Sequence, residues 1–152
     1  TQRLNDAMES HYQELQQYYK KHGLIMSVFY FINKVRTGGD WDLKNQGDWN
    51  LVKNQDYVYN GITIRSDEPG NIHFGYVGSV IFDAETLQAG AGVYQILSDT
   101  SKPEFYSSYF DDPIDSMNVM YGYLLKNGSS YSFPGYTITI EEFEKTYRET
   151  HK

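Results

Sequence analysis

The chain has no cysteine among its 152 residues. This absence excludes disulfide bonds, a thiolate nucleophile and a cysteine-based zinc site. No run of about 18 apolar residues is present, which excludes a membrane-spanning helix. No signal peptide is recognisable, and the chain begins with Thr1 rather than Met. We therefore expect it to be a module cut from a larger protein.

Basic residues are also scarce, because 13 Lys and Arg side chains face 20 Asp and Glu side chains and leave a net charge of −7. This balance argues against a large basic platform for nucleic acid, since phosphate binding draws most of its affinity from Lys and Arg. A small basic cleft remains compatible with it. The P-loop, the zincin helix, the nucleophile elbow and the dinucleotide fingerprint are missing too. Kinases, common metalloproteases, α/β-hydrolases and Rossmann oxidoreductases are therefore disfavoured.

The side chains that are present suffice for a core, with 39% hydrophobic and 16% aromatic residues. Apolar periodicity and cap signals predict a compact single domain over residues 1–152, α+β but mainly α, with about five helices and a small β element. Helices are expected at residues 6–22, 84–97, 112–126 and 140–150, with Asp83 before the 84–97 helix and Thr139 before the 140–150 helix as their start signals. Residues 24–35 form a helix or a strand, and their length favours a helix. Residues 24–35 are apolar almost all round, which predicts burial on every side. A strand is expected at residues 57–64, where Asn60-Gly61 can form a hairpin turn.

The most polar cluster of the sequence is Val35–Lys44, at the end of the apolar run 24–35. Two glycines, two carboxylates, an indole and two cations lie there within ten residues. Gly38-Gly39 can turn sharply and lie close to another chain or a ligand. The cluster is too polar for a core and too aromatic for a plain solvated loop, so we interpret it as part of a site. A turn held by Asp40 and a surface lysine is the alternative. The site candidates here are Arg36, Trp41, Asp42 and Lys44.

His73 is the histidine best placed for chemistry. It lies between Gly70 and Gly75, in a segment expected to bend. An imidazole can act as general acid or base near neutral pH. A structural histidine bonded to nearby backbone is an equal alternative. The other three histidines, His11, His22 and His151, are expected at the surface.

Three carboxylates, Asp111, Asp112 and Asp115, form a second polar cluster. Clustered carboxylates suit Mg²⁺ or Ca²⁺, which makes a divalent metal a candidate cofactor with Asp111 and Asp115 as its ligands. Asp-Pro-x-Asp is also an ordinary way to begin a helix, with Asp112 as the N-cap. Capping leaves Asp111 unexplained, so this residue is a catalytic or metal-binding candidate.

Four blocks in this order resemble the bacterial polymorphic toxin type 44 domain: Val35–Lys44, Gly70–Gly78, Leu87–Gln95 and Asp111–Asp115. The resemblance implies a C-terminal toxin module of a larger secreted protein, delivered into a competing bacterial cell and neutralised by a cognate immunity protein. It also implies a nuclease that acts on RNA.

The favoured hypothesis is a hydrolase that cleaves phosphodiester bonds in nucleic acid, preferably RNA. His73 is then general acid or base, Lys44 and Arg36 stabilise phosphate charge, and Asp42 or Asp111 orients the histidine or binds a metal. Trp41 and Asn71 are candidates for substrate binding. The residues 38–44, His73 and Asp111 are expected around one cleft. The alternatives are a hydrolase of a lipid-linked cell-wall precursor and a non-catalytic module that binds protein or carbohydrate.

Overall fold

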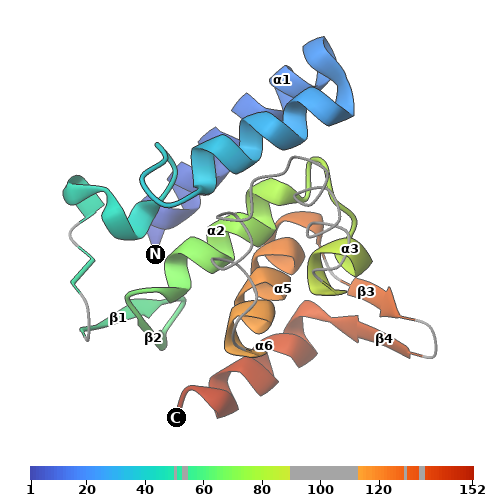
Figure 1. Cartoon of the computed structure of the whole chain (residues 1–152). Helices are drawn as coiled ribbons and strands as arrows, with labels where there is room; N and C mark the ends of the chain where they lie inside the picture. The colour runs from blue at the N-terminus through green and yellow to red at the C-terminus, as the bar shows by residue number, and fades with distance from the viewer. Residues whose placement is uncertain (50, 53–54, 90–112, 129, 134–135) are drawn as a thin grey trace.

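The computed structural model is mainly helical, with two small β hairpins (Figure 1). It describes residues 1–49, 51–52, 55–89, 113–128, 130–133 and 136–152. The elements are α1 (Gln2–Val35), the 3-10 helices η1 (Leu43–Asn45) and η2 (Gly47–Trp49), β1 (Asp56–Tyr59), β2 (Ile62–Arg65), α2 (Glu68–Gly78), α3 (Ala84–Ala89), α5 (Pro113–Asn127), β3 (Ser130–Phe133), β4 (Tyr136–Thr139) and α6 (Ile140–Thr150). The predicted α+β, mainly α class is confirmed.

The predicted number of helices needs correction. Within the described ranges, α1, α2, α5 and α6 are the four helices of 11 residues or more, and α3 has only 6. The count is therefore four rather than about five, with α3 as a short additional piece. The part of the predicted 84–97 helix that follows Ala89 lies outside the described residues. No helix in the described part of the chain is long and apolar enough to cross a membrane.

The helix α1 is a hairpin of two helical segments. The chain reverses at Gly23, whose φ of 81° and ψ of −178° lie in a region that is essentially open only to glycine. Tyr18 stacks on Tyr30 with ring centroids 4.0 Å apart, so the two segments pack side by side (Figure 1). The expected break between residues 22 and 24 is confirmed, although the first segment begins earlier than predicted, at Gln2.

The core forms where α2 crosses α5. A Cβ atom on Gly75 would lie 1.7 Å from the Val119 carbonyl oxygen, and one on Gly122 would lie 1.9 Å from the Ile72 carbonyl oxygen. The two backbones therefore touch at glycines. The prediction that the segment around Gly75 bends is wrong, because the segment is a regular helix in which Gly75 serves this close approach.

Local signals define several boundaries. Asn60 and Gly61 have φ of 51° and 75° and join β1 to β2 in the expected hairpin, as a two-residue turn of this kind requires. The Asp83 carboxylate accepts a hydrogen bond from the Thr86 amide at 2.7 Å and begins α3. The Thr139 hydroxyl accepts one from the Glu142 amide at 3.2 Å and begins α6. These three predictions are confirmed.

Candidate functional site

The loop after α1 is built by its own backbone and by Asp42. Gly38 has φ of 82°, and a Cβ on Gly39 would lie 2.3 Å from the Lys34 carbonyl oxygen, so both positions require glycine. The Asp42 carboxylate accepts hydrogen bonds from the Gly38 amide at 2.9 Å and from the Asn45 side chain at 2.5 Å. Asp42 therefore holds the loop in shape, and the loop carries Trp41 into the interior.

Trp41 packs against two histidines from different helices. Its ring stacks on His11 of α1 with centroids 4.5 Å apart and an interplanar angle of 14°, and lies edge-on to His73 of α2 at 5.9 Å. The Nδ1 atom of His11 is 2.8 Å from the Nε2 atom of His73, a hydrogen bond between the two rings. We call this group the His11–His73 pair.

Burial keeps both rings of the pair neutral at neutral pH. His73 is 1% exposed, and burial, followed by the neighbouring His11, lowers the pKa of His73 to about 3. The pKa of His11 is also lowered, mainly by burial; Glu14 opposes this effect and Lys34 adds to it. The Nδ1 atom of His73 is buried and has no hydrogen-bond partner among the described residues. Such an unsatisfied atom costs stability and is expected at functional rather than purely structural positions.

Polar groups surround the half-buried His11 on the outer side of α1. The Tyr30 hydroxyl donates a hydrogen bond to the Glu14 carboxylate at 2.6 Å. The Lys34 ammonium is 3.1 Å from an Asp40 oxygen and 5.8 Å from the centre of the Trp41 ring. A carboxylate, a phenol and a cation thus lie near His11, the groups from which acid–base sites are assembled.

A second polar cluster joins α1, α2 and α5. The Tyr76 hydroxyl donates to Glu9 at 2.5 Å, and the Lys126 ammonium is 3.0 Å from the same carboxylate. These contacts, with the Tyr76 hydrogen bond foremost, lower the pKa of Glu9 to about 2. Lys126 also lies over the Tyr12 ring at 4.2 Å. Every polar group in this cluster has a partner, so it serves to lock the three helices together.

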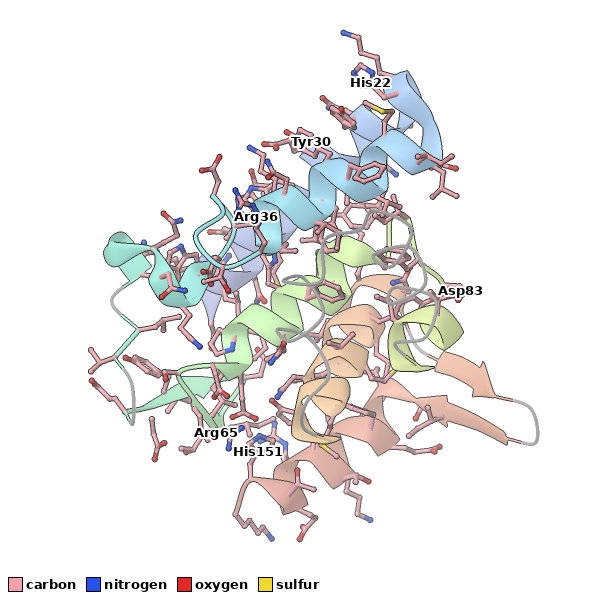
Figure 2. The ribbon with its side chains drawn as sticks, in the orientation of Figure 1. His22, Tyr30, Arg36, Arg65, Asp83 and His151 are labelled. Carbon is pink, nitrogen blue, oxygen red and sulfur yellow. The ribbon has the colours of Figure 1, made fainter. Side chains whose placement is uncertain are left out.

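A third cluster is buried at the other end of α2. Glu68 is 1% exposed and accepts hydrogen bonds from the Arg65 amide at 2.6 Å and the Asn118 side chain at 3.0 Å. His151 contacts the same carboxylate at 2.6 Å, and Tyr147 donates to Asn118. Figure 2 shows His151 beside Arg65, at the opposite end of the molecule from His22. This network fixes the end of α6 to the start of α2.

The remaining predicted site residues lie in varied settings. Lys44 lines an open pocket of about 750 Å³ together with Arg65, Ser66 and Asp67. Arg36 is exposed and donates to the Asn33 side chain at 3.0 Å, and half-buried Asn71 donates to the Asp67 carbonyl at 3.5 Å. The predicted residues that the structure brings together are therefore His73 and Trp41.

The predicted metal-binding residues, Asp111 and Asp115, come before and at the start of the sequence of α5. Asp111 and Asp112 lie outside the described residues, as does the side chain of Asp115 in the first turn of α5. Among the described residues, no group of three or more His, Asp or Glu side chains could hold a metal ion.

The prediction that His11 and His151 lie at the surface is wrong. The His11 ring is half-buried against Trp41 and His73, and the His151 side chain is only 10% exposed beside Glu68. The helical spacing of the sequence indicated burial of His11, because His11 follows the buried Met8 by three residues and precedes the buried Leu15 by four. His151 had a comparable signal, because it follows the buried Tyr147 by four residues.

Comparison with protein families identifies the family of this chain. The model of the bacterial toxin 44 family matches residues 30–128, about two thirds of the chain. The chain belongs to the bacterial toxin 44 family. The matched part of this toxin 44 domain contains Trp41 and His73, whereas His11 and His151 lie outside it. No curated protein and no solved structure matches the chain.

Proposed function

We propose that this toxin 44 domain is a hydrolase in which His11 is the general base and His73 positions it. The observation that carries the proposal is the hydrogen bond of 2.8 Å between the two rings, with His11 stacked on Trp41 and His73 edge-on to it. If the two side chains only stabilised the fold, a pair that leaves no buried nitrogen without a hydrogen bond would be more stable. Nδ1 of His73 has no partner among the described residues.

The hydrogen bond sets the chemistry of His11. When Nδ1–H of His11 donates to Nε2 of His73, the Nε2 atom of His11 is left as a proton acceptor. Because both pKa values are lowered, this acceptor is unprotonated at neutral pH. The buried His73 then holds the orientation of His11 and the position of its proton, as second-layer partners of catalytic groups do.

We infer that the substrate is a phosphodiester and favour RNA. The Nε2 atom of His11 takes the proton of a ribose 2′-hydroxyl, the oxygen attacks the adjacent phosphorus, and the bond to the 5′-oxygen breaks. That oxygen takes a proton from water, the hydroxide left behind takes the proton from His11, and a 2′,3′-cyclic phosphate is formed. Addition of water to this cyclic phosphate, with loss of one of its two ribose oxygens, completes the hydrolysis. Lys34 and Arg36 supply the positive charge for the phosphate, with Lys44 beyond the loop. Asp42 contributes by holding the loop, and Asn71 and Asp111 keep their predicted roles as site candidates.

Family membership supports the biological setting. We propose that the domain is part of a secreted effector delivered into a target bacterial cell, and that a cognate immunity protein protects the producing cell. A domain without disulfide bonds can fold after transfer into a reducing compartment.

Expression in bacteria without an immunity protein tests this function. We expect toxicity in the cytoplasm with loss of intact cellular RNA, and no toxicity for His11→Ala. His22→Ala is the matched control, because it removes an exposed imidazole from the same helix. Toxicity only after export would favour a cell-wall precursor as substrate. No toxicity in either compartment would favour a non-catalytic binding module.

A further inference from the structure

The turn of the α1 hairpin exposes an unusual number of large apolar side chains. Ile25 is 72% exposed, and Leu24 and Met26 are 50% and 51% exposed. Phe29 and Tyr19, on either side, are 44% and 40% exposed. The described residues contain only two other exposed large hydrophobic side chains, Val52 and Val58. The prediction that the second segment of α1 is buried on all sides is therefore wrong for its first half.

The same part of the chain has a charge opposite to that of the rest. Residues 15–39 contain Lys20, Lys21, Lys34 and Arg36 and no Asp or Glu, a net charge of +4. Because the whole chain carries −7, the other residues carry −11. Lys20 and Lys21 are both exposed at the end of the first helical segment, directly before the turn.

We propose that the hairpin turn, residues 19–29, docks on the surface of an anionic lipid bilayer. Exposed apolar side chains beside lysines are the composition of segments that insert shallowly at a membrane interface. Lys20 and Lys21 add attraction to anionic headgroups, and the aromatic rings of Tyr19 and Phe29 suit the boundary between headgroups and acyl chains. The segment projects as one end of the molecule, so it can reach a flat surface (Figure 1).

Charge favours a bilayer over a second copy of the chain as the occupant. Two copies meeting through their turns would bring Lys20 and Lys21 of each copy together, which is repulsive. A bilayer rich in anionic lipid offers the complementary charge across the whole face. Docking in this way leaves the His11–His73 pair outside the bilayer, because the helix rises about 18 Å from Gly23 back to His11. The proposal does not depend on the reaction that His11 performs.

Flotation with lipid vesicles tests this docking. We expect the full chain to float with phosphatidylcholine vesicles that contain phosphatidylglycerol and to remain unbound with pure phosphatidylcholine. Ile25→Asp should lower the binding constant at least tenfold. The double variant Lys20→Gln/Lys21→Gln should lower it by about fivefold per lysine and weaken its dependence on salt. Val58→Asp is the matched control, because Val58 is 64% exposed on β1, away from the turn.

Three results would overturn the proposal. The first is failure of the wild-type chain to bind anionic vesicles. The second is an equal loss for Val58→Asp and Ile25→Asp. The third is absence of vesicle binding together with a stable dimer in sedimentation velocity that the Ile25→Asp variant does not form. The turn would then bind a second copy of the chain. His11→Ala should float like the wild type, so loss of the proposed reaction and loss of docking can be told apart.

Discussion

At the scale of single residues, the hydrogen bond between His11 and His73 gives the two rings different roles. His11 is half-buried whereas His73 is 1% exposed, so in the proposed mechanism His11 meets the substrate and His73 acts through His11. We predict that His73→Leu lowers kcat by about 10- to 100-fold with KM little changed, and that His73→Gln, which can still bond to His11, recovers part of the loss. Steady-state kinetics of the two variants measures this. Equal losses in both would contradict a positioning role.

Protonation of His73 makes the stability of the fold depend on pH. The pKa of His73 is about 3 in the folded chain and about 6.5 when unfolded, so the unfolded state binds the extra proton first as pH falls. Stability is therefore full above pH 6.5 and is lost below it, by up to about 1.4 kcal/mol per pH unit. Urea unfolding at pH 7.5, 6 and 5 measures the slope. His73→Gln should flatten it, and an unchanged slope in this variant would mean that His73 is not the linked group.

Of the His11–His73 pair, the sequence alone predicted only His73 as a site residue. His73 stood out because its neighbours are glycines and apolar residues, and Trp41 because of its polar setting. His11 did not stand out, because its partners are 30 and 62 positions away along the chain. Stacking and hydrogen bonding at such separations depend on tertiary packing, which no local pattern encodes.

At the scale of elements, the stability of the fold depends on close contact between the helices α2 and α5. Gly75 and Gly122 let α2 and α5 touch, and a Cβ atom at either would lie less than 2 Å from backbone. We predict that Gly75→Ala and Gly122→Ala each destabilise the fold by about 3 kcal/mol, because the helices must separate. Gly70→Ala is the control on α2, with open space around the added methyl group, and should be neutral or stabilising by up to about 1 kcal/mol. Thermal melts compare the three; equal effects would contradict this packing.

The buried network between α2 and α6 is a second test at this scale. His151→Ala leaves the Glu68 carboxylate buried without its 2.6 Å partner. We predict a loss of about 1 to 3 kcal/mol in the free energy of unfolding, the cost of leaving a buried acceptor without one of its hydrogen-bond partners. Replacement of the exposed neighbour Lys152 by Ala is the control, because its contact with Glu149 lies at the surface. Chemical denaturation at pH 7 measures both, and a His151→Ala variant as stable as wild type would contradict the role of the network.

Element boundaries were predictable where a local signal existed. Asp83, Thr139 and the pair Asn60-Gly61 each mark an end or a turn through bonds to near neighbours. The helix α2 was missed because glycine disfavours helices locally, while the contact with α5 that requires glycine is not visible in the sequence.

At the scale of the whole molecule, the two proposed functional regions lie at opposite ends of the α1 hairpin. One end carries the His11–His73 pair against the loop of Trp41, and the other carries the apolar turn around Gly23. The family match begins at residue 30, so both the turn and His11 lie in the part of the chain before it. The predicted site residues inside the match thus depend on a segment outside it.

Cleavage of RNA by the purified domain tests the central claim most directly. A single-stranded RNA carrying a fluorophore and a quencher reports the rate for wild type, His11→Asn and the control His22→Asn. We predict that His11→Asn loses about 10²- to 10⁴-fold in rate while His22→Asn matches the wild type. Wild-type cleavage that His11→Asn leaves unchanged, or a folded wild-type domain that does not cleave RNA, would contradict the account.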